Sequence, residues 1–101
     1  MTVEQFYSLK NERHVTATNW CQHLLHNALG QRCLEGALIH CYGDHTPAMV
    51  EAKRKVEAAI TGRHRYYNFG PGSSIPSIPA FNDASNRQFA DIMRVVREAK
   101  V

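Results

Sequence analysis

A change in the apolar pattern between residues 19 and 42 is the feature that most constrains the fold of this chain. Apolar side chains in residues 20–29 form one helical stripe, and those in residues 33–42 form a second stripe that is rotated around the helix axis. The change falls at Gly30, and glycine costs about 1 kcal/mol in a helix interior. The pattern therefore predicts a helix over residues 19–42 that either kinks or breaks near Gly30 or is buried on two sides by different neighbours.

Three further helices are predicted from capping signals and from apolar residues at helical spacing. Thr2-Val3-Glu4-Gln5 matches a capping box, which predicts a short helix over about residues 3–12. Asp44-His45-Thr46-Pro47 is a strong start signal, so we expect a helix over residues 47–61. The apolar periodicity near the end of the chain predicts a last helix over residues 84–99.

Residues 62–82 show neither helical nor strand periodicity, and they contain three of the four prolines of the chain. A connection of this length is unusual in a compact domain and is usually functional. We therefore expect an ordered loop over residues 62–82, rich in proline, glycine and serine, before the last helix. The predicted fold is all-α: an irregular, orthogonal bundle of four or five helices that forms a single helical domain over residues 1–101.

The short length of the chain favours self-association. With 101 residues, of which 44% are hydrophobic, the chain can bury only one modest core, so stability is marginal unless a second copy or a ligand adds contacts. Burial of a helix on two sides usually requires a partner chain in a domain of this size. We therefore expect a homodimer whose interface uses the second apolar stripe, which contains Cys33, Leu34, Ala37 and Leu38.

A basic and aromatic segment is the strongest functional candidate. The formal net charge is +3, and most of the excess lies between Lys53 and Arg65. Arginine guanidinium groups hold phosphate in two contacts, and tyrosine rings stack on bases, so the pattern predicts binding of a nucleic acid or a nucleotide. In the alternative interpretation the rings hold the loop on the helical core and the arginines are solvated. The candidate ligand-binding residues are Arg63, His64, Arg65, Tyr66 and Tyr67, together with Lys53, Arg54 and Lys55.

Metal binding and catalysis have weaker support in the sequence. His26, Cys33 and His40 lie seven residues apart, so in a straight helix they are separated by about 10 Å of rise and cannot share one tetrahedral ion. No Cys-x-x-Cys pair, phosphate-binding glycine loop or nucleophile elbow is present. We therefore predict no metal site, no cofactor and a binding role rather than catalysis, with a small zinc-binding helical protein as an alternative.

A second alternative is a protein–protein interaction module or inhibitor that docks on another protein through the loop and the second apolar helix face. The three cysteines have no framework spacing, which indicates free thiols in a reducing compartment. No apolar run approaches the roughly 20 residues that span a bilayer, and the first residues do not resemble a signal peptide. We therefore expect a cytoplasmic protein that does not interact with membranes.

Overall fold

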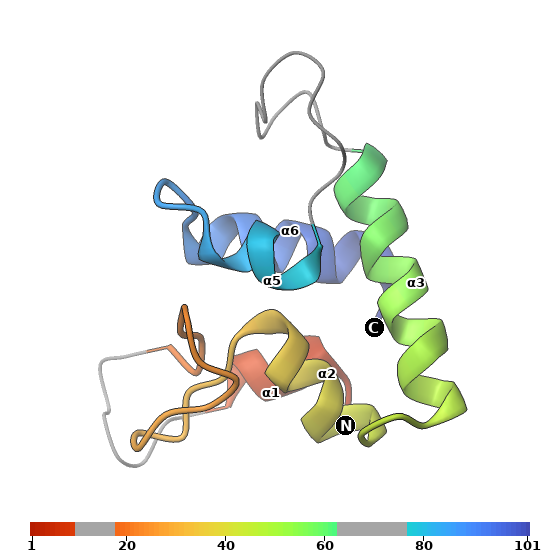
Figure 1. Cartoon of the computed structure of the whole chain (residues 1–101), viewed down its shortest axis with the longest axis horizontal. Coiled ribbons are helices and arrows are strands. Elements are labelled where there is room, and N and C mark those ends of the chain that lie inside the picture. Colours follow the sequence, from red (N-terminus) through yellow and green to blue (C-terminus); the bar gives the residue numbers. More distant parts are fainter. Residues whose placement is uncertain (10–17, 63–76) are drawn as a thin grey trace.

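The computed structural model describes residues 1–9, 18–62 and 77–101. Within these ranges the secondary structure is helical apart from two isolated β-bridges, which confirms the predicted all-α fold. The helices form an irregular bundle in which α3 runs across the end of α6 (Figure 1). Their bounds are α1 Val3–Ser8, α2 Leu34–Tyr42, α3 Pro47–Gly62, α5 Ile78–Asp83 and α6 Phe89–Ala99.

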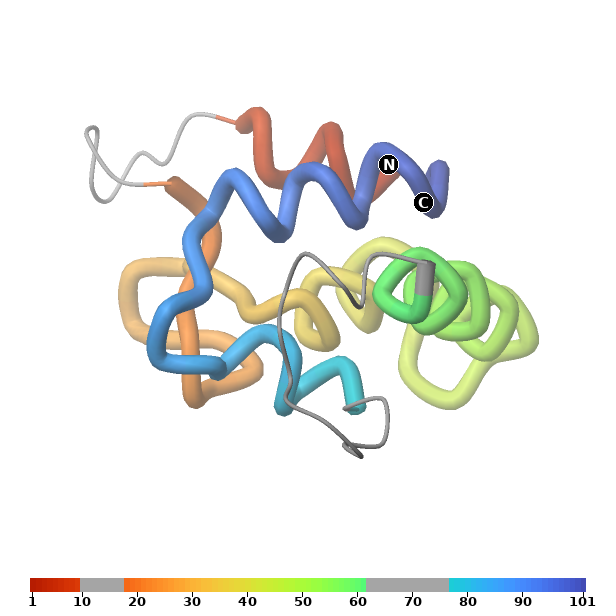
Figure 2. Tube along the Cα trace, turned by 90° about the horizontal axis from the view of Figure 1, so that it is seen from above, coloured from red at the N-terminus to blue at the C-terminus, as the bar shows by residue number. Residues whose placement is uncertain are grey.

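Side chains from all five helices form one hydrophobic core. α1 packs against α6, and the backbone N–H of Val3 donates to the carbonyl oxygen of Val101 at 2.9 Å. The two ends of the chain therefore lie next to each other (Figure 2). The largest side chains with almost no exposure are Phe81, Leu34, Leu38, Ile60, Ile78 and Ile92.

Two of the predicted helix starts are present, with the expected capping bonds. The Thr2 side chain accepts from the backbone N–H of Gln5, and the Gln5 side chain accepts from that of Thr2, which is the predicted capping box. At the start of α3, the Thr46 hydroxyl accepts from the N–H of Met49 at 3.0 Å. α6 begins at Phe89, five residues later than predicted, and Gln88 is its N-cap.

The predicted helix over residues 19–42 is wrong in its first half. Residues 18–33 are irregular, and only α2 is helical. His23 and Gly30 have φ values of +74° and +78°, which no right-handed helix contains. Trp20 and His26 each form an isolated β-bridge with Arg32, so this segment folds back on itself.

The predicted loop over residues 62–82 contains a helix at its end. α5 begins after Ser77, whose hydroxyl accepts from the N–H of Ala80 at 3.3 Å. Pro79 lies in the first turn of α5. Backbone N–H groups in a first turn have no acceptor within the helix, so the missing N–H of proline costs no helical hydrogen bond. Residues 63–76 of the predicted loop lie outside the described residues.

Asn82 holds the irregular segment against the helices. Its side chain is fully buried, and its Oδ1 accepts from Trp20 Nε1 at 2.6 Å and from the N–H of Leu34 at 3.0 Å. Its Nδ2 donates to the carbonyl oxygen of Cys21 at 3.1 Å. One amide group on α5 therefore fixes both the start of residues 18–33 and the start of α2.

We expect Asn82→Ala to destabilise the protein by about 2–4 kcal/mol, because it leaves a half-buried indole N–H and a buried backbone N–H without their acceptor. Urea unfolding followed by fluorescence of Trp20, the only tryptophan, measures this change. Asn27→Ala is the control, because Asn27 is only half-buried and bonds within its own turn. Equal losses in the two variants would contradict the role of Asn82.

At Gly36 the backbone of residues 18–33 lies directly against α2. A Cβ atom added at Gly36 would lie 2.0 Å from the carbonyl oxygen of Leu25, which is far below any allowed contact. Alanine normally stabilises a helix interior by up to about 1 kcal/mol relative to glycine. At Gly36 we expect alanine to lower the stability instead, since the added methyl group meets the backbone of Leu25 and not a flexible side chain.

Gly36→Ala is therefore expected to lower the free energy of unfolding by at least about 1 kcal/mol, through displacement of the Leu25 backbone or of α2. The same urea titration measures this loss. An increase in stability would show that residues 18–33 do not pack on α2 in solution.

Candidate ligand-binding site

The predicted ligand-binding residues divide into two groups in the structure. Arg63, His64, Arg65, Tyr66 and Tyr67 lie outside the described residues. Lys53, Arg54 and Lys55 lie on α3. Since successive helical residues point in directions about 100° apart, these three cations do not share one face of the helix.

Two of the three α3 cations are paired with carboxylates. The Lys53 ammonium lies 3.1 Å from Glu35 Oε1 on α2, and both side chains are partly buried. Arg54 forms an ion pair with Glu51, one turn earlier on the same helix. The positive charges of Lys53 and Arg54 are therefore balanced locally, whereas Lys55 has no ion pair in the described part of the chain.

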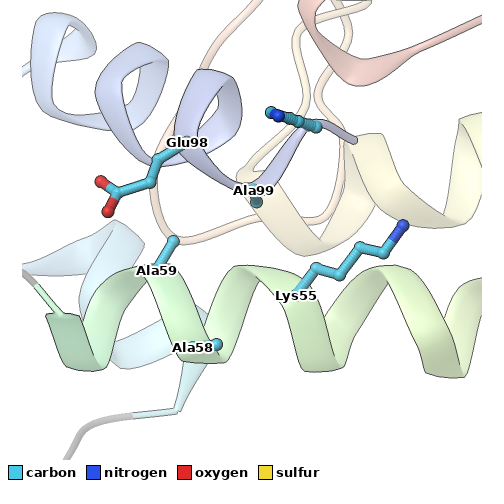
Figure 3. Close-up of a pocket in the computed structure, with 6 residues that line it drawn as sticks. Lys55, Ala58, Ala59, Glu98 and Ala99 are labelled. Atoms are coloured by element: carbon cyan, nitrogen blue, oxygen red, sulfur yellow. The ribbon is translucent and has the colours of Figure 1, made fainter.

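Lys55 lines an open pocket of about 370 Å³ between α3 and the end of α6. The pocket is lined by alanines from both helices, with Lys100 and Glu98 contributed by the α6 side. Figure 3 shows the Lys55 ammonium and the Glu98 carboxylate pointing to opposite ends of the pocket. The full lining is Lys55, Ala58, Ala59, Glu98, Ala99 and Lys100.

The conformation of Lys100 follows from the way α6 ends. Lys100 is the C-cap residue with φ 57° and ψ 44°, a left-handed conformation, and its N–H donates to the carbonyl oxygen of Val96 at 3.0 Å. Its side chain is exposed, and within the described residues it has no ion pair. The pocket therefore brings together two lysines that are 45 positions apart in the sequence, Lys55 and Lys100.

The described residues contain equal numbers of basic and acidic side chains. The whole formal charge of +3 is therefore contributed by residues 10–17 and 63–76. The second of these segments follows α3 directly in the sequence.

The predicted dimer interface is buried inside the chain. Cys33, Leu34, Ala37 and Leu38 have exposed fractions of 5% or less. They contact the chain's own core, and the Cys33 sulfur accepts from the N–H of Gly36 at 3.3 Å as the N-cap of α2. The second apolar stripe is thus covered within one chain, and these side chains are not available to a second copy.

The structure exposes an apolar surface that was not expected from the sequence, at residues 21–31, which we call the leucine loop. Leu24, Leu25 and Leu29 are 56%, 49% and 37% exposed. The loop contains no Asp, Glu, Lys or Arg. Its signal in the sequence was the apolar content of residues 20–29, which was interpreted as the buried stripe of a helix.

Hydrogen bonds fix the leucine loop at several points. The N–H of His23 donates to Asp83 Oδ1 at 2.9 Å, and Gln22 Nε2 donates to the carbonyl oxygen of Ala84 at 3.0 Å. Farther along, Asn27 and Gln31 bond to each other at 2.8 Å, and Gln31 Nε2 donates to the carbonyl oxygen of Thr18. These bonds hold the exposed leucines on a defined backbone.

The three cysteines are free thiols. Burial raises the pKa of Cys21 to about 11, with further contributions from Cys33 and Asp83, and burial also raises the pKa of Cys33. Among the described residues no three His, Cys, Asp or Glu side chains converge on a point that could hold a metal ion. In the same ranges no helix is long and apolar enough to cross a bilayer.

Together these features define a small all-α protein with a two-lysine pocket at one side and an exposed leucine loop. A protein-family comparison matches residues 10–100, and the chain belongs to this family, which is described as a family of unknown function (DUF6197). No curated protein and no solved structure shows significant similarity to the chain.

Proposed function

We propose that this protein is a small binding module for a phosphate-bearing ligand, either a nucleic acid or a nucleotide. The observation that carries the proposal is that Lys55 and Lys100 line one open pocket and that neither lysine has an ion pair in the described part of the chain. Two ammonium groups beside one cavity are suited to a phosphate, which carries one to two negative charges.

The composition of the pocket indicates how the ligand would be held. The alanines leave room for a phosphate to approach the helix surfaces. The C-terminal end of α6 is the negative end of its dipole, and Glu98 adds a carboxylate at the rim. Both of these charges oppose an anion, so binding requires both lysines together.

The proposal also assigns a role to the basic and aromatic segment that follows α3 in the sequence. Arg63 and Arg65 follow α3 in the sequence and would donate charge-assisted hydrogen bonds to further phosphates. Tyr66 and Tyr67 would stack on bases, which favours a single-stranded nucleic acid or a nucleotide over a duplex. Affinity supplied in this way falls as salt is added, because phosphate contacts release counterions.

Fluorescence anisotropy with a labelled single-stranded DNA, a labelled RNA of the same sequence and a labelled adenine nucleotide tests the site. We expect Lys55→Gln and Lys100→Gln each to weaken binding roughly fivefold to tenfold at low salt. Each variant should also reduce the slope of log affinity against log salt concentration by about one, because one phosphate contact is lost.

Lys53→Gln is the matched control, because it removes the same charge from α3 at a lysine that is already paired with Glu35. It is expected to leave the affinity within about twofold of wild type. If Lys53→Gln weakens binding as much as Lys55→Gln, the effect is one of net charge and the pocket is not the site. Undetectable binding of all three probes throughout the salt titration would exclude the function itself.

A second candidate function, self-association as a homodimer, is favoured by the leucine loop. Its three leucines are exposed on a backbone that hydrogen bonds hold in place. Because residues 21–31 carry no formal charge, two copies of the loop can meet without electrostatic repulsion. Under this proposal the contact between copies uses Leu24, Leu25 and Leu29 and not the buried residues of α2.

Sedimentation velocity over a range of concentrations tests this contact. We expect wild type to show a concentration-dependent dimer, and Leu24→Asp or Leu25→Asp to shift the equilibrium toward monomer by roughly tenfold or more. Val50→Asp is the control, since Val50 is 63% exposed on α3, outside the leucine loop. A wild type that is monomeric at every concentration would contradict the proposal.

The proposed setting is the cytoplasm. Three free thiols, all with pKa values raised by burial, are compatible with a reducing compartment in which they stay protonated.

A further inference from the structure

A parallel β-bridge brings two cysteines into register at the base of the leucine loop. Trp20 and Arg32 form the bridge. The N–H of Arg32 donates to the carbonyl oxygen of Asn19 at 2.7 Å, and the N–H of Cys21 donates to that of Arg32 at 3.2 Å. The next residue on each of the two segments is a cysteine, so Cys21 and Cys33 are adjacent positions across the bridge.

This register matches the spacing that a disulfide needs. Neighbouring strands lie about 4.8 Å apart, and a disulfide spans Cα atoms separated by about 4.4–6.8 Å. In a parallel pair, the positions that follow a bridge have their side chains on the same face. The register of the bridge therefore favours a bond between Cys21 and Cys33.

The two thiols share part of their electrostatic environment. The charge of Cys33 raises the pKa of Cys21, and the Asp83 carboxylate raises the pKa of both thiols. Cys21 is half-buried and accessible to a small solute, whereas Cys33 is buried. Cys21 is thus the thiol that an oxidant meets first, and Cys33 is next to it.

We propose that Cys21 and Cys33 form a disulfide when the protein meets a hydroperoxide, and that this bond closes residues 21–33 into a covalent ring. The Cys21 thiolate attacks one oxygen of hydrogen peroxide and breaks the O–O bond, which gives a sulfenic acid and a first water molecule. The Cys33 thiolate then attacks the Cys21 sulfur and expels hydroxide, which leaves as a second water. Two thiols are oxidised, and one peroxide is reduced to two water molecules.

The bond changes the contacts of the leucine loop. The Cys21 thiol donates its proton to the carbonyl oxygen of Leu24 at 3.5 Å, and oxidation removes that proton. The freed carbonyl belongs to one of the exposed leucines. Trp20 is the residue before Cys21, so its fluorescence reports the change.

The reaction is slow at neutral pH and accelerates in base. The thiolate is the reactive form, and the pKa of Cys21 is about 11. Below that value the thiolate fraction rises about tenfold for each pH unit, so we expect the oxidation rate to rise about a hundredfold between pH 7 and pH 9.

Peptide mapping of the full chain after treatment with one equivalent of hydrogen peroxide tests the proposal. Under denaturing, non-reducing conditions, the whole protein should lose two hydrogen atoms in mass and remain monomeric. Trypsin cleaves after Arg32, so Cys21 and Cys33 fall in different peptides, residues 14–32 and 33–53, which the bond joins.

Three variants make the assignment specific, because Cys41 lies in the same tryptic peptide as Cys33. Cys41→Ser should keep the joined peptides, whereas Cys21→Ser and Cys33→Ser should lose them. Serine retains an N-cap acceptor at position 33, and Trp20 fluorescence checks that each variant is folded.

Loss of the joined peptides in Cys41→Ser would overturn the proposal. So would the appearance of disulfide-linked dimers, or of singly oxidised cysteines without a bond between the two peptides. Fragmentation of the joined wild-type peptides locates the bond at Cys33 or Cys41 directly, so the result does not depend on the folding of any variant.

Discussion

The buried amide of Asn82 is the interaction on which the rest of the structure depends. Residues 18–33 contribute few side chains to the core, so apolar burial alone does not hold them in place. Asn82 satisfies the indole of Trp20 and the first N–H of α2 at the same time. A buried polar group without a partner destabilises a fold by more than one hydrogen bond stabilises it. Any other path of residues 18–33 would leave these groups without partners, so the Asn82 amide specifies a single arrangement of the segment.

The sequence correctly predicted the helix starts that are fixed by capping groups within one turn of the chain. The Thr2 capping box and the Thr46-Pro47 start are satisfied within one turn, and both were found where the sequence placed them. The path of residues 18–33 depends instead on Asn82, about 60 positions away, and on the close approach of Gly36 to Leu25. The apolar spacing of residues 20–29 is therefore compatible with a helix that the chain does not form.

At the candidate site, too, the sequence predicted the residues that are neighbours in the chain but not the contacts between distant residues. The basic run at Lys53, Arg54 and Lys55 is evident in the sequence, but the partner of Lys53 is Glu35 on another helix. Charge composition alone could not distinguish the paired lysine from the unpaired one. Lys100 was not predicted as a site residue, because only the crossing of α3 and α6 brings it to the pocket of Lys55.

The pocket and the leucine loop lie in different parts of the molecule. α3 is at one end of the long axis, and residues 18–33 are at the other, in both views (Figures 1 and 2). Lys55 and Leu24 share no hydrogen bond or ion pair in the described part of the chain, so variants at the two positions should act independently. Cys21 and Cys33 lie at the base of the loop, where a covalent bond would alter the leucines without altering the lysines. The proposed ligand binding and the proposed self-association therefore depend on separate parts of one small core.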